Sequence, residues 1–556
     1  MSIVREVSDP RGRLHLCLLS SCFLLLFCFM GTIPHTPESQ ANELVNLTLH
    51  DEVYTFIKRL TAKNLIKKRL DTTQPIARRE IAEALIEASE KHQLGQVELT
   101  DIEEKHLRYY QWLFGDEIET LRPGFLAPTK RKHTITLKGK DYKGDFDFKA
   151  KQEVAHVKPD SGDQQSKSIT SLDFILRAKL GEQVGVSSIL HDRLLAGSAD
   201  YNPYRTEGSA KFMAGESRTI NSMEGYIVLG LPWIRIQWGI DEDWWGPGWR
   251  GALMLSDNSA PRDNLKISGL YGPIKFTYFT AILRENTPEY QPRYMSAHRL
   301  EFLPYRGINI GLSEVMMFAD RYELRYLNPF TVFYMSQPDD LRSNGLLGVD
   351  FDITLLPAIE LYGELMVDDL QTAEGLDILR VWNSKYGILA GGYWADPLGF
   401  KDTDIRIEYA FVNQYAYTHK YDITRYTYRG FVIGHWIGTD ADDLWFDIEH
   451  WFTDKLRASL TYERERQGEG DVEKNHPLDH SPRPPKTEDI DAPEYWEFLS
   501  GIVESTHSLS MGISYTSIGR YSAGVEYTYS QIRNVNHNPG ADGEEHRLVM
   551  KAEYRF

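Results

Sequence analysis

The residues best suited to binding chemistry lie in one short stretch of the chain. It consists of Trp244, Trp245, Gly246, Pro247, Gly248 and Trp249. Pro247 has a fixed φ and a glycine on each side, so we expect a tight, rigid turn that holds the indole rings at fixed angles. Buried rings at such a turn would serve as packing, and the residue types favour this role. The alternative is a carbohydrate platform, because flat aromatic faces beside carboxylates suit the apolar faces and hydroxyls of sugars.

An acidic triplet precedes this turn and offers a second kind of chemistry. Asp241, Glu242 and Asp243 could supply oxygen ligands to a divalent cation. A solvated acidic turn is the favoured interpretation, so the sequence predicts no metal site.

The sequence lacks the common catalytic motifs. It has no Gly-x-Ser-x-Gly elbow, no His-Glu-x-x-His pair and no phosphate-binding Gly-x-x-x-x-Gly-Lys-Ser/Thr loop. The nearest approach to a histidine constellation is His435 with His450, which we expect on adjacent strands. We therefore expect no catalytic residue and no cofactor, and a hydrolase with catalytic groups on an outward rim is the least favoured class.

A second motif follows the tryptophan turn, and its residues are Ser256, Asp257, Asn258, Ser259, Ala260 and Pro261. Together the two motifs resemble the Wzi-type capsule assembly family of outer-membrane proteins, whose pattern runs WWGPGW and then SNNARP. The chain departs from that pattern at Asp257, where the family often has Asn, and at Ser259 and Ala260, where it has Ala and Arg. A role of that family arginine is therefore not carried over to this chain.

The 556-residue chain carries a strong acidic excess, with a formal net charge of −18. Nucleic acid is not an expected partner, because binding its phosphates requires a basic surface. The excess also argues against broad electrostatic capture of an acidic polysaccharide. Such binding would depend on local clusters of Lys and Arg.

The N-terminus has the features of a secretory signal peptide. Arginines precede an apolar run over residues 14–30, and Ser39, Gln40 and Ala41 form a small-x-small cleavage site, so we expect residues 1–41 to be removed. A retained membrane anchor is the less favoured alternative. All three cysteines lie in this leader, so the mature chain would have no disulfide and no thiolate metal site.

Residues 42–128 are predicted to form a periplasmic helical module of about three helices. Apolar residues repeat there at helical spacing, for example Val53, Phe56, Ile57 and Leu60, and Pro75 separates the first two segments. The fragment over residues 75–82 adds to the family resemblance, since these proteins commonly place a similar helical element before the barrel.

Residues 129–556 are predicted to form a large transmembrane antiparallel β-barrel, so the fold class is mainly β. Apolar and polar residues alternate in recurring runs of about ten residues, as in strands with lipid on one face and a wet lumen on the other. The length of this region predicts about 18 strands, the number that the resemblance also implies. The last strand ends on Tyr554 and Phe556, which resembles the assembly signal of outer-membrane barrels. A soluble β-sandwich is the less favoured alternative.

The resemblance implies a non-enzymatic, lectin-like protein of the cell outer membrane that anchors or organises capsular or exported polysaccharide. Its expected partners are surface or capsular polysaccharide, outer-membrane lipid and the barrel assembly machinery, and we expect a monomer. The main alternative is a diffusion porin or glycan-uptake channel. A plugged lumen would favour the anchor, and the aromatic content of residues 233–261 favours a plug.

Overall fold

The computed structural model describes residues 44–125, 133–160, 163–198, 209–214, 217–284, 291–336, 342–369, 384–474, 498–517 and 520–556. The predicted signal peptide lies outside these ranges, as do the predicted domain boundaries at residues 41/42 and 128/129. The leader and the exact boundaries therefore stay predictions.

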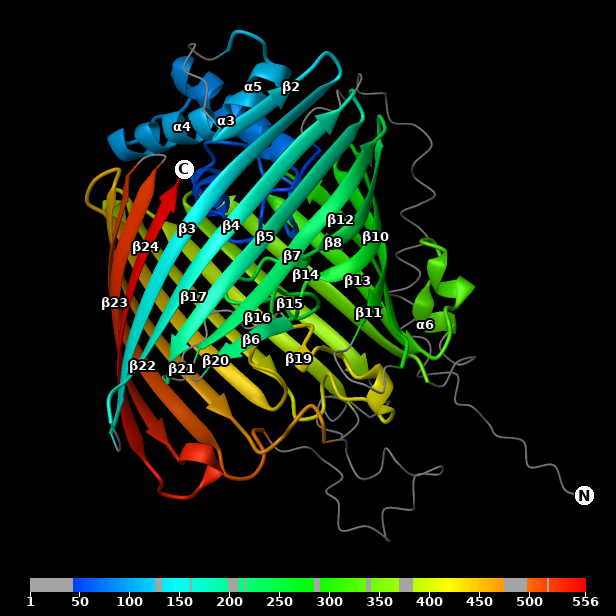
Figure 1. The fold of residues 1–556 in the computed structure, drawn as a ribbon, viewed down its shortest axis with the longest axis vertical. Helices are drawn as coiled ribbons and strands as arrows, with labels where there is room; N and C mark the ends of the chain where they lie inside the picture. Colours follow the sequence, from blue (N-terminus) through cyan, green and yellow to red (C-terminus); the bar gives the residue numbers. More distant parts are fainter. Residues whose placement is uncertain are drawn as a thin grey trace, which may run out of the picture.

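The chain forms a closed antiparallel barrel of 18 strands (Figure 1). The strands of the wall are β3 (Tyr142–Pro159), β4 (Gln165–Leu180), β5 (Val184–Gly197), β7 (Ser217–Gly230), β8 (Ile234–Asp241), β10 (Arg262–Tyr271), β11 (Ile274–Leu283), β12 (Arg293–Tyr305), β13 (Ile308–Ala319), β14 (Asn344–Leu356), β15 (Ile359–Asp369), β16 (Lys385–Ala395), β17 (Thr403–Val412), β20 (Ala441–Trp451), β21 (Leu456–Gln467), β22 (Glu504–Ser517), β23 (Tyr521–Arg533) and β24 (Gly543–Arg555). This confirms the predicted fold class and strand number.

Shorter elements lie beside the wall or in its connections. They are β1 (Thr73–Gln74), β2 (Ile135–Lys138), β6 (Ser209–Ala214), β9 (Trp244–Trp245), β18 (Thr427–Tyr428), β19 (Phe431–Val432), η2 (Leu324–Leu327), α6 (Phe333–Ser336), η5 (Pro397–Gly399), η6 (Asp422–Thr424) and η9 (Val535–His537). β2 pairs with one end of β3, and β6 pairs with one end of β7.

The connections between strands differ in length at the two ends of the barrel. One end, here called the short-turn end, has turns such as residues 231–233 and 306–307. The opposite, long-loop end has connections such as residues 242–261 and 413–440. This asymmetry is the one expected for short periplasmic turns and long extracellular loops.

The strands follow the predicted alternation of apolar and polar faces. On β22, Leu509, Met511 and Ile513 are exposed on the outer surface. The intervening residues face the lumen, where the hydroxyls of Ser508 and Ser530 lie 2.8 Å apart across β22 and β23. An apolar outer face and a polar inner face are typical of a barrel in lipid. None of the helices within the described ranges has both the length and the apolar character needed to cross a membrane.

The barrel closes where its last strand meets its first. β24 pairs antiparallel with β3, the amide of Phe556 donates to the carbonyl of Phe148 at 3.0 Å, and the hydroxyl of Thr134 donates to the Phe556 carbonyl at 2.9 Å. Tyr554 and Phe556 are exposed, and their rings meet edge to face with centroids 4.8 Å apart. Both residues thus lie at the closing seam, and their part in assembly stays a prediction.

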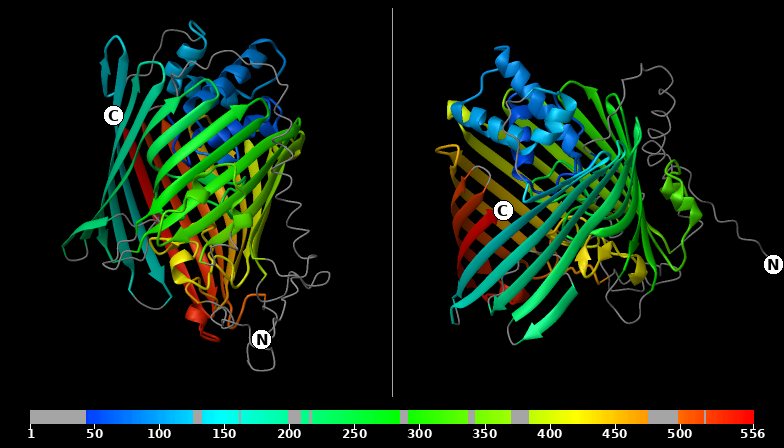
Figure 2. Two further views of the ribbon diagram at one scale, coloured as in Figure 1. Left: turned by 90° about the vertical axis from the view of Figure 1, so that its right-hand side faces the viewer. Right: turned by 45° about the horizontal axis from the view of Figure 1, so that its top comes forward.

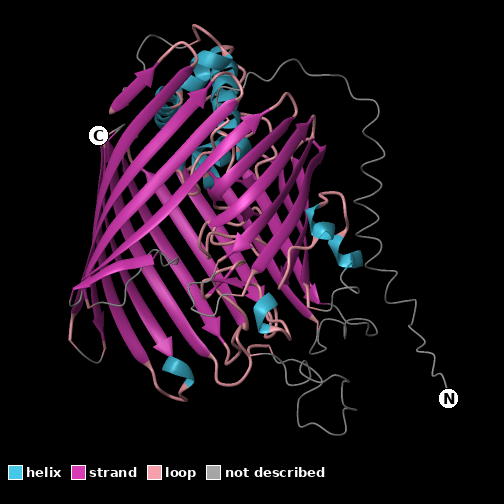
Figure 3. Ribbon diagram, turned by 45° about the vertical axis from the view of Figure 1, so that its right-hand side comes forward, coloured by secondary structure: helices cyan, strands magenta, loops and turns pink. Residues whose placement is uncertain are grey.

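A helical module covers the short-turn end of the barrel (Figures 2 and 3). Its described helices are α2 (Glu52–Ala62), α3 (Arg78–Gln93), α4 (Asp101–Leu113) and α5 (Gly115–Leu121). The side chain of Asp51 caps α2, and Thr100 with Glu103 forms a capping box on α4. The sequence predicted about three helices, but the helical path breaks at Phe114, before Gly115, a poor helix former, and α5 forms a separate helix.

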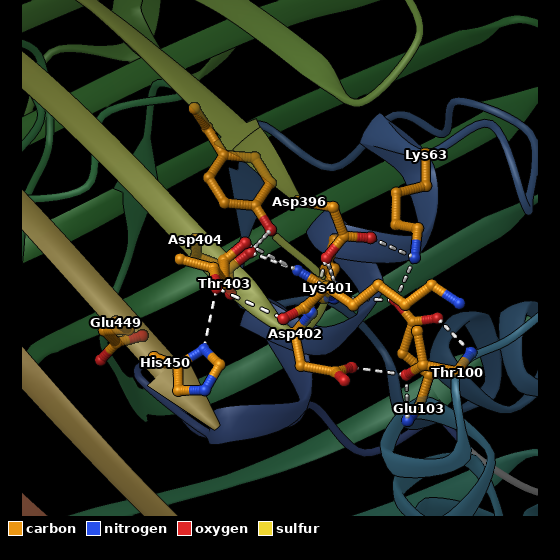
Figure 4. Close-up of polar contacts among 12 residues, drawn as sticks. Lys63, Thr100, Glu103, Asp396, Lys401, Asp402, Thr403, Asp404, Glu449 and His450 are labelled. Atoms are coloured by element: carbon orange, nitrogen blue, oxygen red, sulfur yellow. Dashed lines mark hydrogen bonds and ion pairs between the residues drawn. The ribbon is translucent and has the colours of Figure 1, made fainter. Parts of the chain in front are cut away.

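Ion pairs attach the module to the turn between β16 and β17 (Figure 4). Arg59 of α2 donates to Glu103 of α4 at 2.8 Å and to Asp404 of β17 at 2.6 Å, and it also pairs with Asp396 in the turn. Lys63 lies 2.7 Å from the Asp396 carboxylate. Burial raises the pKa of Asp396, but the ion pairs with Arg59 and Lys63 outweigh it, so that the pKa lies below its usual value.

Candidate functional site

Both sequence motifs lie inside the barrel, in the connection of residues 242–261. This connection packs against residues 413–440, and we call the two segments together the lumen plug; Figure 3 shows loops in the barrel interior. The hydroxyl of Tyr417 donates to the Leu253 carbonyl at 2.7 Å, and that of Tyr426 donates to the Met254 carbonyl at 2.6 Å. The plug therefore has a hydrogen-bonded core of its own.

The N-terminal segment reaches the plug from the module. Within the plug, β9 pairs antiparallel with β1, so that Trp245 lies opposite Thr73. Glu301 of β12 accepts hydrogen bonds from both hydroxyls of Thr72 and Thr73, at 3.0 and 2.7 Å. Module, plug and wall are thus connected through one short two-stranded sheet.

Two carboxylates of the wall hold the backbone of the tryptophan turn. Glu408 of β17 accepts hydrogen bonds from the amides of Trp249 at 2.6 Å and Arg250 at 2.9 Å. Glu364 of β15 accepts from the amide of Leu253 at 2.7 Å and from that of Gly248 at 3.4 Å. Backbone amides that would otherwise lack acceptors in this loop are satisfied in this way.

Gly246 has a structural reason to be glycine. Its φ is +146°, and a Cβ built on it would lie 2.1 Å from Oε1 of Glu364. No other residue can occupy this position unless the carboxylate moves.

The three indole rings of the turn are largely covered by protein. Trp244 and Trp245 are 4% and 1% exposed, and Trp245 meets Phe279 edge to face. Trp249 is half-buried, with the Lys58 ammonium 4.7 Å and the Arg406 guanidinium 4.4 Å from its ring centroid. Protein groups therefore occupy the positions where a platform would present ring faces to a sugar.

The second motif is divided between the plug core and a cavity. Ser256 and Asn258 are buried, and the Asn258 amide donates to the Val432 carbonyl at 2.9 Å. Pro261 is half-buried where β10 begins. Asp257 is half-buried, and its carboxylate lies 2.8 Å from Nε2 of His50.

The cavity beside Asp257 has a volume of about 520 Å³ and lies between the N-terminal segment, the plug and the wall. Its lining includes His50, Glu242, Asp257, Lys149, Lys151 and Arg177. Burial, together with the nearby charges of Glu224 and Asp257, raises the pKa of Glu242. Acidic and basic groups line one space there, which suits a hydroxylated or charged small ligand.

The prediction that the acidic triplet forms a solvated turn is wrong for two of its three residues. Asp241 and Asp243 are buried, and the Lys266 ammonium lies 3.2 and 2.7 Å from their carboxylates. A lysine on β10 thus provides the charge that a cation would otherwise supply.

The prediction that His435 and His450 lie on adjacent strands is also wrong. His450 lies on β20, but His435 lies in the plug, where a Cβ on Gly251 would contact its ring.

One described group, formed by Asp116, His133 and Asp145, has the spacing of a metal site. The Lys143 ammonium already lies 2.7 Å from Asp116 and 2.9 Å from Asp145, so the group is an ion network between module and barrel.

Glu364 and Glu408, the residues that hold the turn, were not singled out from the sequence. Alternation places Glu408 on the polar face of its strand, which is a usable local signal. It does not name the partner, since Trp249 lies 159 positions away along the chain.

Comparisons with known proteins agree with this architecture. The family described as capsule assembly protein Wzi matches residues 142–546. A curated Klebsiella pneumoniae relative, described as an uncharacterized 55.8 kDa protein in the cps region, is 22% identical over 183 residues, which are 29% of this chain and 36% of that protein. The match thus spans about a third of the relative's length.

Two solved structures match this chain. One is Escherichia coli Wzi, described as an outer membrane protein involved in group 1 capsule assembly and a carbohydrate-binding β-barrel; it is 15% identical with a TM-score of 0.57, covering 93% of this chain and 99% of that one. The other is OprD from Pseudomonas aeruginosa, 9% identical with a TM-score of 0.40, covering 74% and 93%.

Proposed function

This chain belongs to the Wzi family of capsule assembly proteins in the outer membrane, and we propose that it anchors capsular or exported polysaccharide at the cell surface without altering it chemically. A capsule-related role in the outer membrane follows from the family. The lectin-like anchoring, the polysaccharide as partner and the non-enzymatic mode are the parts we propose. The description of Escherichia coli Wzi as a carbohydrate-binding barrel supports them.

The observation that carries the proposal is the attachment of the lumen plug to the wall. Glu408 and Glu364 hold the tryptophan turn across the lumen, and residues 413–440 pack against it. A diffusion porin or uptake channel of this architecture would need a water-filled passage through the same space. A plug attached to the wall in this way therefore favours an anchor over a channel.

The connections at the long-loop end supply a surface for the polymer. Tyr421, in the second plug segment, is 37% exposed. Aromatic rings of this kind can stack on the apolar faces of sugars. The tryptophan turn, in contrast, acts in this proposal as packing that stabilises the plug.

Anchoring can rest on weak contacts because the polymer repeats. Each contact alone is expected to have an affinity on the order of millimolar, but a chain whose repeats rebind at high effective concentration is retained much more strongly. This mechanism requires binding surfaces and no catalytic group. It also explains how an acidic barrel could retain a polymer without a broad basic surface.

The experiment is a deletion strain, complemented by the wild-type gene, in a host that makes the polymer. Total and cell-associated polysaccharide are measured. Loss of an anchor shifts polymer from the cells to the medium while total output is conserved. An unchanged partition would refute anchoring. A change in permeability alone would identify a channel, and a change in polymer chain length would identify a hydrolase.

A further inference from the structure

Three arginines lie on the outer face of the barrel at its long-loop, extracellular end. Arg464 and Arg466 are on β21 and share its face with Leu460, which is exposed on the outer surface. Arg533 ends β23. Arg466 lies opposite Ser505 of β22, which in turn lies opposite Arg533, so that one row crosses three strands. Neighbouring strands are about 4.8 Å apart, so the side chains of this row can reach one ligand.

The positive charge of this arginine row is only partly balanced. Asp442 of β20 accepts a hydrogen bond from Nε of Arg466 at 2.8 Å and lies 3.7 Å from Arg464. Arg533 is exposed and has no ion pair with the described part of the chain. Glu544 of β24 also points outward, and Asp542 accepts from the Asn534 amide at 3.3 Å, but neither carboxylate forms an ion pair with Arg533 within the described residues. His507 of β22 lies opposite Arg464 of β21 on the same outer face.

An apolar strip continues from the arginine row toward the membrane centre. Leu509, Met511 and Ile513 of β22 and Val525 of β23 are exposed on the same outer face. Arg464 lies four positions beyond Leu460 along β21, which corresponds to about 13 Å. A ligand that fits both features has an anionic head at the rim and acyl chains along the strip.

A second pair of titratable side chains on the outer face is covered by protein. His298 and Glu314 lie 2.8 Å apart and are both buried. The connection carrying α6 lies outside the wall (Figure 1) and donates the amides of Phe333 and Tyr334 to Glu314. There the chain covers both side chains, whereas Arg464 and Arg466 are half-buried and Arg533 is exposed with no ion pair to the described residues. Its counter-charge must come from outside the protein.

We propose that the arginine row binds the phosphate groups of a phosphorylated, acylated glycolipid of the outer leaflet, namely lipopolysaccharide. The planar guanidinium fork matches phosphate oxygens in two parallel hydrogen bonds, and basic groups near an anionic membrane surface add to this attraction. The chain thereby carries a lipid site on its outer wall, separate from any polysaccharide surface on its loops. This inference does not depend on the anchoring proposal.

The test uses the purified full-length barrel in detergent, with purified lipopolysaccharide and its dephosphorylated form as probes. Arg464→Gln combined with Arg533→Gln should weaken binding of the phosphorylated form about thirtyfold, at roughly fivefold per arginine. The dephosphorylated form should bind wild type as weakly as the phosphorylated form binds the double variant. Arg520→Gln is the matched control, because Arg520 is an exposed arginine in the short turn between β22 and β23 at the opposite end.

Circular dichroism and the faster migration of unboiled protein show that the double variant is folded. Equal binding by wild type and double variant, or no discrimination between the two probes, would overturn the proposal. So would a double variant that binds lipopolysaccharide normally but loses acidic polysaccharide. Cell-bound polysaccharide should be unchanged in the double variant, which separates this test from that of anchoring.

Discussion

Replacing Glu408 by Gln tests whether the wall carboxylates hold the lumen plug. In the wild type, Oε2 accepts from the Trp249 amide and the Tyr362 hydroxyl, and Oε1 accepts from the Arg250 amide. The glutamine side chain has one acceptor oxygen. When this oxygen takes the place of Oε2, the hydrogen bonds from the Trp249 amide and the Tyr362 hydroxyl are retained. Its NH₂ group then faces the Arg250 amide, which loses its acceptor.

The magnitude follows from the type of bond that is lost. A hydrogen bond to a charged acceptor contributes about 1.5–3 kcal/mol, and the unpaired buried donor adds to the effect. The Arg250 amide should therefore exchange with solvent deuterium about ten- to a hundredfold faster. The Trp249 amide keeps its acceptor and should change much less. In a planar lipid bilayer, the loosened plug should also raise the ion conductance above that of wild type.

The matched control is Glu153→Gln. Glu153 is equally buried in the lumen wall, but its ion-pair partners are Lys151 and Lys551, which belong to the wall. This variant should leave the exchange of both plug amides unchanged. If the Arg250 amide in Glu408→Gln exchanged at the wild-type rate, the carboxylate would not be what holds the turn. Equal acceleration at both amides would contradict the bond-by-bond reasoning.

Three further predictions concern the seam, the turn and the module. Deleting Phe556 removes a backbone hydrogen bond at the closing seam, so less protein should insert; normal surface levels would count against an assembly role. Trp245→Ala empties a buried site and should cost about 3–5 kcal/mol, measured as a lower melting temperature than for Trp249→Ala; unchanged stability with lost glycan retention would favour the platform. Because the Asp396 pKa lies below its usual value, the ionised carboxylate stabilises the module contact fully above about pH 4. This stabilisation is lost as the pH falls through the lowered pKa. Proteolytic release of the module should rise in that range in wild type and be independent of pH in Asp396→Asn.

The wall could be predicted from the sequence because strand alternation is a local property. Each run of about ten residues shows its apolar face without reference to any other strand, and total length then sets the strand number. The aromatic content of residues 233–261 favoured a plug, but the attachment of the plug could not be predicted in this way. Glu364 and Leu253 are 111 positions apart, and nothing near either residue indicates the other. The prediction for the acidic triplet was wrong for the same reason, because the burial of Asp243 depends on its ion pair with Lys266 of the next strand.

The net charge is misleading for a related reason. A charge of −18 suggests an acidic surface, yet several carboxylates are inside the barrel and bonded to the plug or module, including Glu301, Glu364, Glu408 and Asp404. These groups cannot repel a polymer or a lipid at the outer face. The arginine row on the outer face can therefore act locally although the whole chain is acidic.

The plug also affects how the long loops can work as an anchor. Weak contacts add along a repeating polymer only if the groups that make them stay in place, because ordering a mobile loop costs entropy at each contact. The plug connects β8 and β10 to β15 and β17 across the lumen, and β1 connects it to the module. The loop of residues 413–440 begins and ends on this support and carries the exposed ring of Tyr421. Loosening the plug by Glu408→Gln should thus reduce polysaccharide retention even though Glu408 is remote from the cell surface, whereas Glu153→Gln should not. Full retention with a demonstrably loosened plug would show that the loops hold the polymer without its support.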